Sequence, residues 1–80
     1  MNVEVRLYAT LAEHVRRACI GEPIDLAIPD ESSIGDLIEA LNIPPDEVHL
    51  VIVDGRMVHD RTNHLADGSR VAFFPPVGGG

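Results

Sequence analysis

The chain of 80 residues contains no lysine, so its positive charge rests on six arginines against 13 acidic residues. The formal net charge of −7 repels phosphate backbones, which argues against nucleic acid as a partner. The same charge favours a protein partner with a basic surface. The missing lysines are explained either by arginine-rich codon use or by a chemical need to avoid amines, and composition leaves both explanations open.

Cysteine is nearly absent as well, since Cys19 is the only one. A single thiol excludes an internal disulfide and any all-cysteine metal or iron–sulfur site within one chain. Its place at the end of an apolar helical stripe predicts a small buried side chain in preference to a reactive thiol. The spacing of His59 and His64 matches no strong metal motif. We therefore predict no metal site.

Long apolar runs are also missing. No run approaches the ~20 residues of a membrane-spanning helix, and no signal-peptide pattern opens the chain. These absences predict a cytoplasmic protein with no membrane partner. No Ser-His-Asp arrangement and no phosphate-binding loop is recognisable, so we expect no self-contained catalytic site and no enzyme activity of its own.

Hydrophobic periodicity divides the chain into short strands and helices. Val3, Val5 and Leu7 alternate with polar residues and predict a half-buried first strand. Asp54-Gly55 is a strong two-residue turn signal between two further strands. Strands are predicted near residues 2–8, 23–29, 48–53, 56–59 and 69–74.

Two segments have helical spacing instead. Residues 32–42 are the stronger case, because Ser33 and Asp36 resemble a capping box and Asn42 suits a left-handed exit. Residues 10–21 predict a shorter helix, with Thr10 as its cap and Gly21 just after its end. Residues 59–66 look irregular. Periodicity thus indicates an α+β fold without fixing its topology.

The segment "LADGSRVAFFPPVGGG", residues 65–80, resembles the C-terminus of the MoaD family, the small subunits of molybdopterin synthase. The related ThiS family of thiamine biosynthesis shares the Gly-Gly end, but its chains are usually shorter and lack the Phe-Phe-Pro-Pro run. One departure is Gly78, where the family usually has Ser, Thr or Ala. The resemblance implies a β-grasp fold: about five strands in a mixed sheet, packed on one main helix, with the first and last strands central and parallel. The body would be residues 1–74 and the tail residues 75–80.

The resemblance also implies a sulfur carrier. In that family a MoeB/ThiF-like enzyme uses ATP to adenylate the terminal glycine, here Gly80, and a sulfur donor then leaves a thiocarboxylate. A MoaE-like large subunit passes the sulfur to a pterin precursor, and the carrier binds no cofactor itself. A ThiS-like carrier, a ubiquitin-like protein modifier and a non-covalent interaction domain are the alternatives.

The residue types of the tail suit that task. Each proline, Pro75 and Pro76, fixes φ near about −65° and favours an extended exit from the sheet. Glycine has no Cβ, so it can pass a narrow channel and be recognised through its backbone. Ordering costs about 1–2 kcal/mol per residue, and the prolines reduce it. Beyond Gly80, the expected recognition residues are Pro75, Pro76, Val77, Gly78 and Gly79.

A second candidate surface lies at the base of the tail. If Val71 and Phe73 face the core, Phe74 faces outward, and Tyr8 is outward by the same alternation. Val58 aligns with a position that belongs to the same apolar surface in the MoaD family. Tyr8, Val58 and Phe74 are therefore predicted to form a partner-binding patch.

Overall fold

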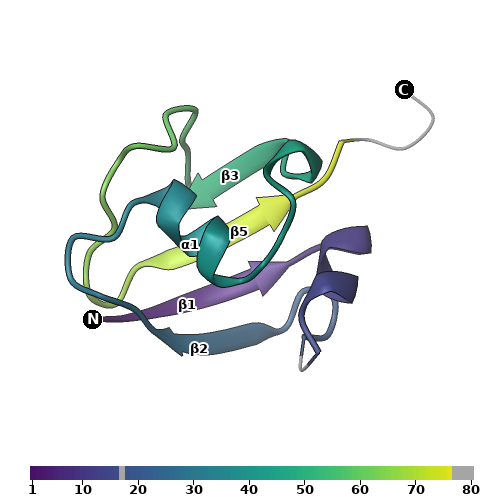
Figure 1. Ribbon diagram of the computed structural model, residues 1–80, viewed down its shortest axis with the longest axis horizontal. Coiled ribbons are helices and arrows are strands. Elements are labelled where there is room, and N and C mark those ends of the chain that lie inside the picture. The colour runs from purple at the N-terminus through teal and green to yellow at the C-terminus, as the bar shows by residue number, and fades with distance from the viewer. Residues whose placement is uncertain (17, 77–80) are drawn as a thin grey trace.

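In the computed structural model the described part of the chain forms a five-stranded sheet with one α-helix against it (Figure 1). The structure describes residues 1–16 and 18–76. The elements in chain order are β1 (Asn2–Leu7), η1 (Ala9–His14), β2 (Pro23–Ala27), α1 (Ile34–Ala40), η2 (Pro45–Glu47), β3 (Leu50–Val53), β4 (Arg56–Met57) and β5 (Arg70–Phe74), where η denotes a 3₁₀ helix.

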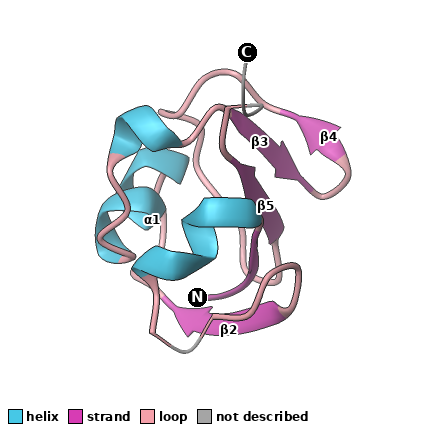
Figure 2. Cartoon of the chain, turned by 90° about the vertical axis from the view of Figure 1, so that its right-hand side faces the viewer, coloured by secondary structure: helices cyan, strands magenta, loops and turns pink. Residues whose placement is uncertain are grey.

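The sheet has the strand order β2-β1-β5-β3-β4. The central strands β1 and β5 run parallel, whereas the other neighbours are antiparallel. The first and last strands therefore lie side by side at the centre, as the β-grasp prediction requires. Figure 2 shows α1 on one side of β3 and β5, and no described helix on the opposite side of these strands. That uncovered side is called the outer face below.

The core lies between α1 and the inner face of the sheet. The predicted alternation of the first strand is confirmed, since Val3, Val5 and Leu7 are all buried. From the last strand Val71 and Phe73 point inward, and Phe73 is the largest of the fully buried side chains. The apolar stripe of the main helix closes the core from the other side, through Ile34, Leu37, Ile38 and Leu41.

Local signals explain the ends of α1 and the hairpin. The Ser33 side chain accepts a hydrogen bond from the Asp36 N–H, and the Asp36 carboxylate accepts one from the Ser33 N–H, so the predicted capping box is present. Asn42 leaves the helix with φ of 57°. Asp54 and Gly55 both have positive φ, which a tight hairpin turn with matching twist needs.

The predicted α-helix over residues 10–21 is wrong. The described residues of this segment form the 3₁₀ helix η1 and no α-helix. Thr10 lies inside η1, and Tyr8 holds the cap position without a side-chain hydrogen bond. The chain must return within a few residues to the edge of β1, where the Gly21 N–H donates to the Leu7 carbonyl at 2.8 Å. Val15 is already extended. This tertiary requirement overrides the helical spacing.

The structure also corrects the expectation for Cys19, whose side chain is exposed rather than buried. It lies in the turn between η1 and β2, next to Ile20, which is 66% exposed. The apolar spacing that suggested burial belonged to the α-helix that does not form. Leu11 and Ala12 are buried in the core, and Val15 and Ala18 pack partly against it, but Cys19 lies beyond them in the turn.

Candidate functional site

The last strand ends at the point where the predicted tail begins. The Phe73 carbonyl accepts a hydrogen bond from the Tyr8 N–H at 3.2 Å, and the Phe74 carbonyl accepts one from the His49 N–H at 2.8 Å. Pro75 and Pro76 have no N–H to donate. Within residues 1–16 and 18–76, the Phe74 carbonyl is thus the final backbone tie of β5. We call residues 73–75 the root of the tail.

Tyr8 and Phe74 meet at this root. Their ring centroids are 4.4 Å apart and their planes differ by 8°, so the rings are stacked. Such pairs are worth about 0.5–1.5 kcal/mol beyond the area they bury. The prediction that both residues face outward and lie together is confirmed by this contact and by the register of β1 with β5. We call them the aromatic pair.

The Tyr8 ring lies directly against Gly21. A Cβ on Gly21 would lie 3.3 Å from Cε1 of Tyr8, and the residue has φ of +76°. Both facts favour glycine here, because a side chain would be strained and would press on the ring. The turn before β2 therefore helps to hold the aromatic pair.

The outer face carries more apolar residues than the sequence reasoning found. Leu50 pairs with Phe74, and Ile52 pairs with Ala72 and with Met57. Cross-strand partners share a face, so all of these side chains lie on the face of Phe74. Met57 is 56% exposed. Leu50 and Ile52 could have been found from the alternation around Val51. The apolar patch consists of Tyr8, Leu50, Ile52, Met57, Ala72 and Phe74.

Val58 does not belong to this patch, contrary to prediction. Its N–H donates to the Val51 carbonyl at 2.9 Å, one step beyond the pairing of Ile52 with Met57. Val51 is buried in the core, so the residue opposite it faces the core as well. Val58 is indeed partly buried and packs against the core cluster.

Charged residues border the patch at the end remote from the tail. The two carboxylate oxygens of Glu4 are each 3.4 Å from a different guanidinium, those of Arg6 and Arg70. Glu4 and Arg70 are direct neighbours in the parallel register. The Arg70 side chain is 81% exposed. Such exposed pairs add little stability, so they matter chiefly as a polar rim.

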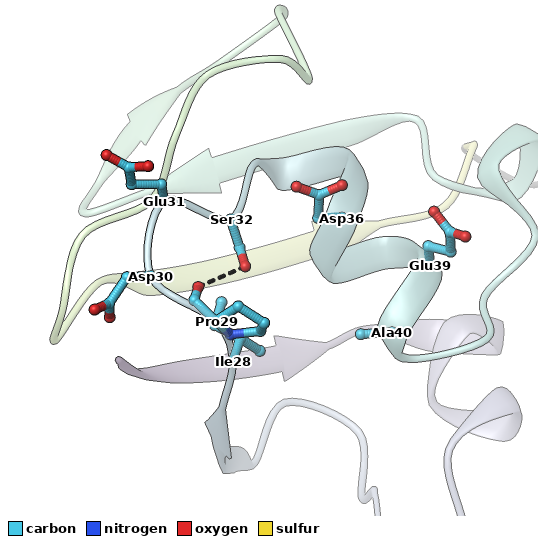
Figure 3. Close-up of a pocket in the computed structure, with 8 residues that line it drawn as sticks. All are labelled: Ile28, Pro29, Asp30, Glu31, Ser32, Asp36, Glu39 and Ala40. Carbon is cyan, nitrogen blue, oxygen red and sulfur yellow. Dashed lines mark hydrogen bonds between the residues drawn. The ribbon is translucent and has the colours of Figure 1, made fainter.

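An acidic groove lies on the opposite side of the molecule, between α1 and the segment after β2 (Figure 3). The Ser32 hydroxyl donates to the Pro29 carbonyl at 2.6 Å and fixes the bend at its base. Hydrogen bonds from Ser33, first of all from its backbone N–H, lower the pKa of Asp36. The groove residues are Ile28, Pro29, Asp30, Glu31, Ser32, Asp36, Glu39 and Ala40.

These carboxylates do not gather around a point. In Figure 3 Asp30 and Glu31 point away from Asp36 and Glu39. No group of three or more His, Cys, Asp or Glu side chains in the described part of the chain is arranged to hold a metal ion. The pKa of Asp60 is lowered too, by hydrogen bonds from the Thr62 hydroxyl and N–H. Neither shift occurs at the aromatic pair.

The described residues thus form one surface that combines exposed apolar side chains with the exit of a proline-led segment. The predicted tail residues Val77, Gly78, Gly79 and Gly80 lie outside the described residues. Pro75 is half-buried and Pro76 is exposed. Among the described helices, none is long and apolar enough to cross a membrane.

Comparison with known families gives one match. The model of the Mut7-C ubiquitin family matches residues 1–78. No curated protein matches the chain.

Solved structures share the whole fold. The HVO 2177 protein of Haloferax volcanii is 31% identical, over 100% of this chain and 87% of that one, with a TM-score of 0.75. The small archaeal modifier protein 1 of H. volcanii is 23% identical over 95% and 98%, with a TM-score of 0.71. A complex of subunits 1 and 2 of the molybdopterin-converting factor of Helicobacter pylori 26695 contains a chain 21% identical over 100% of both, with a TM-score of 0.62. The fold is that of the ubiquitin-like β-grasp proteins.

Proposed function

The chain belongs to the Mut7-C ubiquitin family, and from that premise we propose that it is a sulfur carrier for molybdopterin biosynthesis, acting as the small subunit of a molybdopterin synthase. One observation carries the proposal: the central strand β5 leads straight from a stacked aromatic pair into the Pro-Pro segment of the tail. The molybdopterin would serve a molybdenum or a tungsten cofactor.

The proposed chemistry occurs at the carboxylate of Gly80. A carboxylate oxygen attacks the α-phosphate of ATP, and pyrophosphate leaves. The sulfur of a sulfide-level donor then attacks the carbonyl carbon, the bond to AMP breaks and AMP leaves, and loss of the proton on sulfur gives a thiocarboxylate. The carrier holds no catalytic group for these steps. It is a cosubstrate of partner enzymes in the cytoplasm, binds no cofactor, and leaves ATP to the adenylating enzyme.

The tail has the reach that this requires. Six extended residues from Pro75 span at most ~20 Å. The prolines direct the chain away from the sheet and limit the ordering entropy, while the glycines from Gly78 to Gly80 fit a narrow active site. The body can therefore stay outside the enzyme while the carboxylate enters it.

The apolar patch is the proposed docking surface. Its aromatic pair would supply the buried anchor that such interfaces favour, and the charged rim of Glu4, Arg6 and Arg70 would stay wet. Two partners would use it in turn, a MoeB/ThiF-like adenylating enzyme and a MoaE-like large subunit. The similarity to a chain in the complex of converting-factor subunits supports the second partner.

A second candidate function is protein modification, which the likeness to small archaeal modifier protein 1 favours. The same adenylated tail would then form isopeptide bonds. The chain has no lysine, so it could modify other proteins but could not be extended through lysine linkages on itself. A ThiS-like carrier would share every step except the acceptor.

The test is intact mass spectrometry of the native protein isolated with its adenylating enzyme. A species heavier by the exchange of one oxygen for sulfur at Gly80 is expected, and a chain lacking Gly80 should not form it, because its carboxylate is about 3.5 Å short. Finding Gly80 mainly in isopeptide linkage, with no thiocarboxylate, would favour the modifier. Normal adenylation of the truncated chain would refute both.

A further inference from the structure

One peptide group makes the last backbone hydrogen bond to the root of the tail. The N–H of His49 donates to the Phe74 carbonyl at 2.8 Å, and the other end of the same peptide group is the Val48 carbonyl. Because the two prolines that follow Phe74 offer no N–H, this bond is the last backbone tie of β5 within residues 1–16 and 18–76. The orientation of the Val48–His49 peptide therefore sets the direction in which the chain leaves the sheet.

Arg61 holds this peptide from its other side. One terminal nitrogen of the Arg61 guanidinium donates to the Val48 carbonyl, and the other donates to the Pro45 carbonyl at 2.9 Å. The planar guanidinium thus spans both ends of η2 and fixes the segment that leads into β3. Hydrogen bonds that share a peptide group polarise and strengthen one another.

Arg61 is itself fixed by the main helix. Its backbone carbonyl accepts a hydrogen bond from the Gly35 N–H at 2.9 Å, in the first turn of α1. Its side chain is half-buried, unlike that of the exposed Arg56 on β4. A continuous path of contacts therefore leads from α1 through the Arg61 guanidinium and the Val48–His49 peptide to the Phe74 carbonyl.

We infer that Arg61 is a positioning residue for the tail: it orients the peptide to which the root is tied, and so aims the terminal carboxylate at the adenylating site. The inference rests on the proposed function. Arg61 lies on the helix side of the molecule, away from the apolar patch, so it acts on the placement of the tail and not on docking. Small errors of placement are costly in catalysis, since a shift of about 1 Å can lower a rate ~100-fold.

The experiment measures ATP–pyrophosphate exchange by the adenylating enzyme from the same organism, with the carrier as varied substrate. Arg61→Ala is compared with Arg56→Ala, which removes the same charge from an exposed site. For Arg61→Ala we expect kcat to fall at least about tenfold with KM within twofold, whereas Arg56→Ala keeps both. Arg61→Lys retains one donor and should recover part of kcat.

Amide hydrogen exchange separates positioning from general stability. In Arg61→Ala, or in Arg61→Lys if the alanine variant does not fold, exchange at the His49 amide should accelerate well beyond that at the Val5 and Val71 amides of the central strands. Equal acceleration throughout the sheet, or a change confined to KM, would overturn the inference. If the unchanged protein supports no exchange at all, the proposed function fails and this inference with it; normal kcat in Arg61→Ala overturns the inference alone.

Discussion

Two adjacent phenylalanines should respond to the same substitution in opposite ways. Phe73 is fully buried in the core, whereas Phe74 faces outward and stacks on Tyr8. Truncation of a core phenylalanine typically costs about 3–5 kcal/mol, because the lost transfer energy is joined by an unfilled cavity. At roughly 4–8 °C per kcal/mol for a domain of this size, Phe73→Ala should lower Tm by about 12–40 °C.

Phe74→Ala should leave the fold nearly intact. The variant loses the stacking with Tyr8 and part of a half-buried surface, together about 1–2 kcal/mol. As the proposed anchor of the docking surface, however, Phe74 should contribute about 2 kcal/mol or more to binding. That amount corresponds to a Kd roughly 30 times higher for the large synthase subunit.

Thermal melts followed by circular dichroism and calorimetric titration against the large subunit, at a temperature where both variants are folded, measure the two effects. Phe73→Ala should lose stability with little change in Kd, and Phe74→Ala the reverse. If Phe74→Ala loses as much stability as Phe73→Ala and binds normally, the assignment of the outer face is wrong.

Two further predictions concern local geometry. Gly21→Ala and Gly68→Ala both place a side chain at positive φ, but only Gly21→Ala brings a Cβ within 3.3 Å of Tyr8. Gly68→Ala should lower the free energy of unfolding by about 1–2 kcal/mol. Gly21→Ala should lower it by more and should also shift the aromatic NMR signals of Tyr8. Equal costs and unshifted signals would show that Gly21 does not position the ring. The capping box should make the free energy of unfolding depend on pH. The pKa of Asp36 in the folded protein lies below its ordinary value of 3.8. The stabilisation by its carboxylate is therefore complete above pH 3.8 and is lost as the pH falls through the lower pKa of the folded state. The unchanged chain should be more stable than Asp36→Asn, and this difference should shrink as the pH falls below 3.8. A difference independent of pH would show that the charge of Asp36 does not stabilise the helix start.

The parts of the fold that could be predicted from the sequence are those determined by residues close together in the chain. The alternation of Val3, Val5 and Leu7 gives the inner face directly, and Ser33 with Asp36 marks the start of α1. The segment after β1 was mispredicted because Leu11 and Val15 fit a helix equally well. Tertiary contacts such as the hydrogen bond between Gly21 and Leu7 decide against it.

The candidate site divides in the same way. The closeness of Tyr8 and Phe74 followed from the phases of two strands and from the pairing of the first and last strands that the family resemblance implied. The error at Val58 was avoidable, because a two-residue turn at Asp54-Gly55 already places Val58 opposite the inward Val51. The role of Arg61 could not be predicted from the sequence, because Arg61 lies in an irregular segment and its partners are backbone carbonyls distant in sequence.

The parallel pairing of β1 with β5 also dictates when the molecule can form. Strand β1 cannot complete its hydrogen bonds until β5 exists, and the Asn2 N–H is bonded to Asp67, 65 residues away. Contacts between residues so distant in sequence slow folding, and the sheet cannot be completed strand by strand during synthesis. Tyr8 and Phe74 come together only in this final step. A nascent chain halted before residue 70 therefore lacks the aromatic pair. The proposed docking surface exists only on molecules whose translation has gone past β5.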